Sequence, residues 1–386
     1  MNTIYVDNAA TTRMTKSAVA AILPFLNEKY GNPSSLHSMG QTVANALNKA
    51  RRDIAECLGV KSGEIYFTSG GSESDNQAIL TGAEYGAANG KRRIVSQKTE
   101  HHAVLNTLKR LEKFGFEIEL LDVDREGYVT AKQVRSAIRE DTALVTIMAA
   151  NNEIGTVMPI KEITAVCRER GVLLHTDAVQ AAGHIPLDVH DIGCDMLSLS
   201  AHKFGGAKGV GVLYVRNGIL PSCLISGGGQ EHGVRSGTEN VAGVCAMAAA
   251  LTETVSKLGE NTPKLVTMRD RLIEGLLEIP HSALNGSKTN RLPGNVNVCF
   301  EGIEGESLLL LLDAKGVCAS AGSACASGSL EPSHVLTAIG VPEDYIRGSL
   351  RLSLSDDNTM KEVEYIIKTV KECVGYLRSV SPVWEK

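Results

Sequence analysis

One apolar run of this sequence ends as Ser198-Leu199-Ser200-Ala201-His202-Lys203, and it follows a run that ends in an acid, His175-Thr176-Asp177-Ala178. A lysine at a strand end near a buried acid is the pair with which an enzyme holds pyridoxal 5'-phosphate (PLP). The lysine amine condenses with the cofactor aldehyde, and the acid keeps the pyridine nitrogen protonated so that the ring withdraws electrons. Lysines near strand ends are also common and mostly solvated, so other segments must decide between the two interpretations.

The segments around these two runs alternate between β-like and helical patterns. Apolar runs predict strands over residues 65–68, 93–96, 118–123, 144–149, 172–176 and 196–200. Amphipathic patterns predict helices over residues 41–58, 103–114, 131–138 and 160–170, with a further helix that opens at residue 72. Such alternation predicts an α/β fold with a mostly parallel sheet covered on both faces. Ligands collect at the carboxyl ends of the strands in sheets of this kind.

A second, smaller α/β unit is expected after a helix over residues 241–258. The polar segment 259–263 has the composition of a linker. Beyond it, the patterns predict strands over 295–300 and 350–354 and helices over 306–314, 332–339 and 360–377. We therefore expect a large domain over residues 15–260 and a small domain made of residues 1–14 and 261–386.

Composition disfavours several classes of function. The 386 residues carry 39 basic and 44 acidic side chains, for a net charge of -5, and only 4% are aromatic. Nucleic acid is therefore a poor candidate partner. The N-terminus lacks the features of an export or transit signal, which predicts a cytoplasmic protein. The most apolar stretches, 241–251 and 308–312, fall short of the roughly 20 residues that span a bilayer, so no membrane partner is expected.

The nine cysteines form no Cys-x-x-Cys pair. An odd number of cysteines in this arrangement argues against a disulfide framework and against a structural zinc site, so no metal is expected. Reduced thiols are the simplest interpretation, and one of them stands apart. Cys325 lies among small residues, Cys318-Ala319-Ser320-Ala321-Gly322-Ser323-Ala324-Cys325-Ala326-Ser327-Gly328-Ser329-Leu330. Within a loop over about 318–331 that we expect to be mobile, such a thiol suits covalent transfer between a pocket and a partner.

Several polar segments follow predicted strands at the expected ligand edge. Phe67-Thr68-Ser69-Gly70-Gly71-Ser72-Glu73-Ser74 favours a phosphate at a strand-to-helix turn, although Ser72 would equally serve as a helix N-cap. His101 could stack on a flat cofactor or carry protons, or have no role. The run Asn151-Asn152-Glu153-Ile154-Gly155 could bind a ring hydroxyl or form a turn. Thr238 could contact a phosphate or cap a helix, and Arg351 could bind a carboxylate or be an exposed edge-strand residue.

These segments together resemble NifS/IscS-type cysteine desulfurases, in the class V aminotransferase family. The resemblance runs from Tyr5 to Trp384 and rests on motifs that occur in order. They are Tyr5-Val6-Asp7-Asn8-Ala9-Ala10-Thr11-Thr12, Gly31-Asn32-Pro33-Ser34-Ser35-x-His37, Thr68-Ser69-Gly70-Gly71-Ser72-Glu73-Ser74-Asp75-Asn76, Thr99-Glu100-His101, Asn151-Asn152-Glu153-Ile154-Gly155, His175-Thr176-Asp177-Ala178-Val179-Gln180, Ser200-Ala201-His202-Lys203, Arg235-Ser236-Gly237-Thr238, Gly322-Ser323-Ala324-Cys325 and Ser329-Leu330-Glu331-Pro332-Ser333.

The resemblance implies PLP fold type I, as in aspartate aminotransferase, a homodimer, and conversion of L-cysteine to L-alanine. It implies that Lys203 links the cofactor covalently, that Asp177 pairs with the pyridinium nitrogen and that Cys325 receives the sulfur as a persulfide. Catalytic roles are thus implied for Cys325, Lys203 and His101, which stacks on the ring. Gln180 and Asn152 are implied to contact the cofactor or the substrate. The implied phosphate contacts are Gly71, Ser72, Ser200, His202 and the partner subunit's Thr238. The implied substrate contacts are Arg351, Asn8 and Ala9.

The small residues around Cys325 resemble the subgroup that passes sulfur to an iron–sulfur scaffold, which makes such a scaffold the expected partner. Cys318 could take over the persulfide, and the short C-terminus leaves the identity of the acceptor open. A selenocysteine lyase or an aminotransferase on the same fold is an alternative, and so is an inactive protein that only binds partners. Only desulfuration requires Cys325, and only an active enzyme requires Lys203.

Overall fold

The computed structural model describes residues 3–321, 332–381 and 384, and in this part of the chain the largest sheet has seven strands. Its strand order is β2-β8-β7-β6-β5-β3-β4. Strand β8 is antiparallel to both of its neighbours, and the remaining pairs are parallel. The strands are β2 Ile65–Thr68, β3 Arg93–Gln97, β4 Glu117–Leu121, β5 Thr142–Thr146, β6 Leu173–Asp177, β7 Met196–Ser200 and β8 Gly211–Val215.

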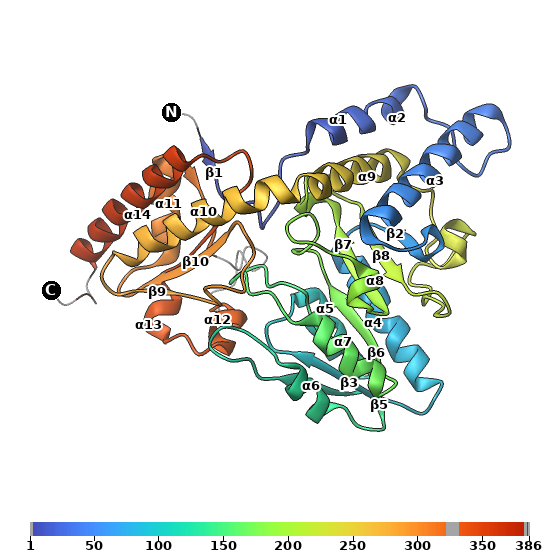
Figure 1. Ribbon diagram of the computed structural model, residues 1–386, viewed down its shortest axis with the longest axis horizontal. Helices are drawn as coiled ribbons and strands as arrows, with labels where there is room; N and C mark the ends of the chain where they lie inside the picture. The colour runs from blue at the N-terminus through green and yellow to red at the C-terminus, as the bar shows by residue number, and fades with distance from the viewer. Residues whose placement is uncertain (1–2, 322–331, 382–383, 385–386) are drawn as a thin grey trace.

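Helices cover both faces of this sheet (Figure 1). One face packs against α4 and α5, and the opposite face packs against α3 and α7. The helices of this part are α1 Lys16–Ile22, α2 Pro24–Asn27, α3 Ser38–Leu58, α4 Gly71–Ala87, α5 His102–Glu112, α6 Ala131–Ala137, α7 Ile160–Glu169, α8 Val189–Ile192 and α9 Val241–Ser256. The expected α/β class with a mostly parallel, doubly covered sheet is therefore confirmed.

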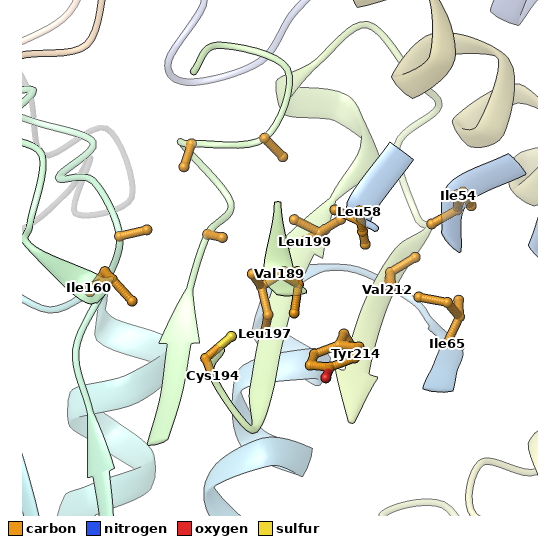
Figure 2. Close-up of a cluster of buried hydrophobic side chains, with 14 of the residues drawn as sticks. Ile54, Leu58, Ile65, Ile160, Val189, Cys194, Leu197, Leu199, Val212 and Tyr214 are labelled. Atoms are coloured by element: carbon orange, nitrogen blue, oxygen red, sulfur yellow. The ribbon is translucent and has the colours of Figure 1, made fainter. Parts of the chain in front are cut away.

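The alternation of side chains along the strands explains why both faces are apolar. In Figure 2, Leu197 and Leu199 of β7 and Val212 of β8 lie on one side of the sheet, near Ile54 and Leu58 of α3. Met196 and Leu213, which alternate with them, belong to the cluster on the opposite face. Strands that are buried on both faces read as continuous apolar runs, which is the pattern that predicted them.

A smaller unit contains the rest of the chain, with the N-terminal strand inside it (Figure 1). Its antiparallel sheet has the order β12-β10-β9, and β1 pairs with β11 in parallel. Its elements are β1 Ile4–Tyr5, α10 Leu258–Leu277, β9 Ser282–Leu284, β10 Asn295–Phe300, α11 Gly305–Ala314, β11 Val317–Cys318, α12 His334–Ala338, α13 Glu343–Ile346, β12 Ser349–Ser353 and α14 Met360–Val380. Ile4 and Val6 share its core with Leu272 and Leu350. The domain limits at residues 14 and 260 stay predictions.

The predicted linker over residues 259–263 is wrong, because these residues form the first turns of α10. Gly259, Glu260 and Pro263 are exposed, so their polarity reflects a solvent-facing helix start rather than a loop. The connection between the units is instead a bend of 72° between α9 and α10. In the described part of the chain no single helix is long and apolar enough to cross a membrane; only the bent pair α9–α10 reaches that length.

Candidate functional site

A cavity of about 590 Å³ opens at the carboxyl ends of the sheet strands, where the sequence predicted a ligand. Strand β2 contributes to this edge because it runs parallel to β7, each being antiparallel to β8. Most of the predicted site residues line this one cavity: Ala9, Gly71, Ser72, His101, Asn152, Asp177, Gln180, Ser200, His202, Lys203 and Arg351. The fold thus brings together side chains from segments spread over most of the chain.

Three predicted residues lie elsewhere or cannot be placed. Asn8 donates through Nδ2 to the Ser353 carbonyl at 2.8 Å and lines a neighbouring cavity of about 710 Å³ instead. Thr238 is exposed and does not line the cavity in its own subunit. Cys325 lies outside the described residues.

Lys203 and Asp177 approach the cavity from adjacent strands. Asp177 ends β6 and lies opposite Ser198 of β7, and a tight 3-10 turn after β7 presents Lys203. Lys203 Nζ donates to the carbonyls of Ala9 and Ala10 at 2.8 and 2.9 Å. Burial raises the pKa of Asp177, whereas His101 and Lys203 lower it. A lysine amine and a buried acid therefore face one pocket, which is the arrangement that PLP requires.

The turn between β2 and α4 lies against Val179 and Ser200, which is possible only because position 71 is glycine. A Cβ atom on Gly71 would lie 2.7 Å from Val179 Cγ2 and 3.4 Å from Ser200 Cβ. The first N–H groups of an α-helix lack partners within the helix, and the helix dipole favours an anion there. The N–H donors, the missing side chain at Gly71 and the lysine–acid pair fit PLP, a flat cofactor that carries a phosphate.

His202 and His101 both line the cavity. Burial, with contributions from Lys203 and Lys208, lowers the pKa of His202 to about 4, and its Nδ1 lies 3.1 Å from Thr11 Oγ1. His101 caps α5 and accepts a hydrogen bond from the Ala103 amide at 3.1 Å. His101 is thereby fixed at the start of a helix, beside the cavity.

Arg351 is buried, with only 1% of its surface exposed, although it lies on the edge strand β12. The alternative of a solvated edge-strand arginine is therefore wrong. Its Nη2 contacts Asp7 Oδ1 at 3.0 Å, and its Nη1 donates to the Asn152 carbonyl at 3.1 Å. Because these partners hold the guanidinium at the cavity wall, it is placed to bind the carboxylate of a small substrate.

Sequence reasoning assigned no role to two buried acids of this region, Asp75, which lines the cavity, and Glu100. Asp75 is fully buried, and burial together with Asp177 raises its pKa well above the usual range. Burial raises the pKa of Glu100 to about 8, even though it accepts hydrogen bonds from the Met148 amide and Gln97. Asp75 lies in the motif 68–76 and Glu100 in the motif 99–101, both of which carried the resemblance. Their position inside these motifs was the available sign of a role.

His175 lies on β6, the strand that ends at Asp177, and is fully buried. Burial lowers its pKa to about 3, and its ring contacts Thr146 Oγ1 at 2.9 Å and Ser198 Oγ at 3.0 Å. A neutral imidazole therefore links strands β5, β6 and β7 directly beneath the end of β6. The motif that contains Asp177 includes this histidine, but its sequence position gave no sign of the contact partners.

Comparisons with known proteins agree with this geometry. A family model described as Aminotransferase class-V matches residues 4–366. A protein named Cysteine desulfurase IscS from Methanosarcina thermophila is 52% identical over 99% of this chain and 95% of its own length. A protein of the same name from Clostridium botulinum strain Hall is 48% identical over 99% of this chain and 97% of its own length.

Solved structures give the same result for the fold. One described as a NifS-like protein has a TM-score of 0.91 and 39% identity, and covers 97% of this chain and 100% of its own. A NifS-like protein from Rickettsia africae has a TM-score of 0.87 at 29% identity, with the same coverage. The family model spans most of the chain, the relatives align over nearly their full length, and the cavity residues fit a cofactor. The chain therefore belongs to the class V aminotransferase family, among its NifS/IscS-type members.

Proposed function

We propose that this chain is a cysteine desulfurase that converts L-cysteine to L-alanine and takes the sulfur onto Cys325 as a persulfide. The observation that carries the proposal is the convergence of Lys203, Asp177 and Arg351 on one cavity. Together they offer an amine for the cofactor, an acid for its ring nitrogen and a cation for an amino-acid carboxylate. The relatives named cysteine desulfurases align over almost the whole chain, which supports the same activity.

PLP, the cofactor of this family, supplies an electron sink for the substrate carbon when it is bound. Asp177 would pair with the ring nitrogen, and the first turn of α4 with Gly71 and Ser72 would hold the phosphate. Arg351 orients the substrate by its carboxylate. With the cofactor and substrate bound, the amine of Lys203 would move the proton of the substrate α-carbon.

Sulfur transfer then falls to Cys325. As a thiolate it attacks the substrate sulfur, a sulfur–sulfur bond forms, and the carbon–sulfur bond of cysteine breaks with its electron pair going to the carbon side. Protonation of that carbon yields alanine. A free thiol has a pKa of about 8.5, so a base must take its proton, and we assign this step to His101 of the cavity wall.

We also propose a homodimer in the cytoplasm that passes the persulfide sulfur to an acceptor protein, an iron–sulfur scaffold. Thr238 supports the dimer, because this residue of the implied phosphate site lies outside the cavity of its own subunit. Large exposed apolar side chains on and near α1 and α2 support an interface as well: Leu23, Leu26, Tyr30 and Leu36.

The test is incubation of purified protein with L-cysteine and a reductant, followed by measurement of alanine and sulfide. Equal amounts of both products, together with a yellow cofactor, are expected. An aminotransferase would instead give a keto acid and would need an amino acceptor. No product in the presence of bound PLP would contradict the proposal.

A further inference from the structure

The turn over residues 151–155 leaves the large sheet after β5 and reaches the small unit. A bridge between Ala150 and Val157 closes it, and the Asn151 amide donates to the Thr156 carbonyl at 2.9 Å. The side-chain oxygen of Asn151 accepts hydrogen bonds from the amides of Glu153 and Ile154 at 2.9 and 3.0 Å. These bonds fix the shape of the turn, so its side chains point in set directions.

Successive residues of this turn contact both the cavity and the small unit. Asn152 lines the cavity, and its carbonyl accepts from Arg351 Nη1 at 3.1 Å. Ile154 is fully buried among apolar residues of the small unit, including Val335 and Leu336 of α12. The turn therefore joins the substrate-binding wall to α12.

Glu153, between them, has a carboxylate that the proposed chemistry does not use. It is 3% exposed, and its Oε2 accepts a hydrogen bond from Ser333 Oγ at 2.6 Å. This distance is in the range of bonds to a charged carboxylate. The Glu153 carbonyl accepts from Asn295 and Asn297 of β10 at 3.3 and 3.1 Å. Ser333 also caps α12 by accepting from the Leu336 amide at 3.2 Å.

The segment that contains Cys325 joins the described structure just before Ser333 and just after Ala321. The Ala321 end is held by β12: Ser320 and Arg351 exchange backbone hydrogen bonds of 3.2 and 2.6 Å, and Ser349 Oγ donates to the Ala321 carbonyl at 3.0 Å. The Ser333 end is held by Glu153. Each end of the segment is thus tied to a residue that is itself part of the cavity wall or bonded to it.

We propose that Glu153 is a positioning residue: its bond to Ser333 sets where the chain re-enters α12 and thereby how Cys325 meets the bound substrate. This inference rests on the proposed function, because it assigns sulfur acceptance to Cys325. On this proposal Glu153 affects sulfur transfer, whereas Lys203, Asp177 and Arg351 bind the cofactor and cysteine.

The experiment compares Glu153→Ala, Glu153→Gln and Ser333→Ala as PLP-loaded full-length enzymes. After cysteine is mixed in, two quantities are followed: the absorbance change of the cofactor against cysteine concentration, and the rate at which the Cys325 peptide gains one sulfur by mass spectrometry. Glu153→Ala should slow the sulfur gain about ten- to a hundredfold, as expected for loss of one charge-assisted bond at a buried site. The absorbance titration should match that of wild type.

Two further comparisons separate positioning from loss of structure. Glu153→Gln keeps an acceptor oxygen and should restore the rate to within about threefold of wild type, since a neutral acceptor still binds the hydroxyl. Ser333→Ala should match Glu153→Ala, and the double variant should lose little more, as coupled partners do. Thr130→Ala, which removes the cap of α6 far from the site, controls for loss of a helix cap and should have the wild-type rate.

The inference is overturned if Glu153→Ala transfers sulfur at the wild-type rate, if Glu153→Gln is as slow as the alanine variant, or if the absorbance titration shifts together with the rate. Should Glu153→Ala fail to fold, Ser333→Ala and Glu153→Gln still give opposite expected rates. A wild-type enzyme whose Cys325 never gains sulfur would contradict the proposed function rather than the role of Glu153.

Discussion

Replacing Arg351 by alanine tests the substrate side of the cavity. Charge-assisted hydrogen bonds are worth about 1.5–3 kcal/mol each, and a factor of ten corresponds to about 1.4 kcal/mol, so the KM for cysteine should rise about 10- to 150-fold. The loss should appear chiefly in KM, with a smaller fall in kcat, because the substrate carboxylate is bound before and during the reaction. The Asp7 carboxylate that loses its partner is 21% exposed, so water will hydrate it and the fold should persist.

The assay is alanine formation over a range of cysteine concentrations. Arg351→Lys should fall between wild type and alanine, because an ammonium keeps the charge but loses the two-pronged geometry of the guanidinium. Arg347→Ala is the matched control: that side chain is 60% exposed and pairs with Glu343 on α13, so its loss should leave KM unchanged. If Arg351→Ala has the wild-type KM and kcat, the carboxylate binds elsewhere and the reasoning from burial and contacts fails.

Three further variants test the cofactor site and the buried acids. Lys203→Ala should abolish both turnover and the cofactor linkage that borohydride reduces; a persistent linkage would contradict its role. Gly71→Ala should weaken PLP retention, measured by dialysis and absorbance, because its Cβ would lie 2.7 Å from Val179 Cγ2, whereas Gly63→Ala, with open space around it, should retain PLP normally. Burial raises the pKa of Glu100 to about 8 from 4.5, so the folded protein keeps a proton that the unfolded chain releases, and stability should fall as the pH rises through that window, by at most about 1.4 kcal/mol per unit. Glu100→Gln removes this dependence, so its Tm relative to wild type should rise between pH 5 and pH 8; a constant difference would argue against the raised pKa.

The main sheet could be predicted from the sequence because its strands are buried on both faces. The continuous apolar runs at 65–68, 93–96 and 196–200 fall on β2, β3 and β7. Strand β8 was not predicted, although Gly211–Val215 is an apolar run like the others. Its antiparallel direction could not have been predicted, because an apolar run carries no information about strand direction. The start of α10 was misread because its first turns are polar and exposed, and polarity alone does not distinguish an exposed helix from a linker.

The candidate site was predicted as a set of residues but not as a set of contacts. Motif positions placed Lys203 and Asp177 at neighbouring strand ends, and the structure puts them in one cavity. The pairing of Arg351 with Asp7 joins residues 344 positions apart, and that of Ser333 with Glu153 joins residues 180 apart. Hydrophobic periodicity and local propensity depend on neighbours along the chain, so contacts between residues this far apart in the sequence left no local signal.

The most direct test of the central claim is mass spectrometry of the Cys325 peptide after L-cysteine is added to PLP-loaded protein. Desulfuration predicts that the wild-type peptide gains one sulfur atom as alanine appears. Cys325→Ser should still bind PLP and cysteine, yet show no sulfur gain and almost no turnover, because a hydroxyl is a far weaker nucleophile toward sulfur at neutral pH. A Cys325→Ser enzyme that makes alanine and sulfide at the wild-type rate would contradict the account and favour a lyase or transaminase.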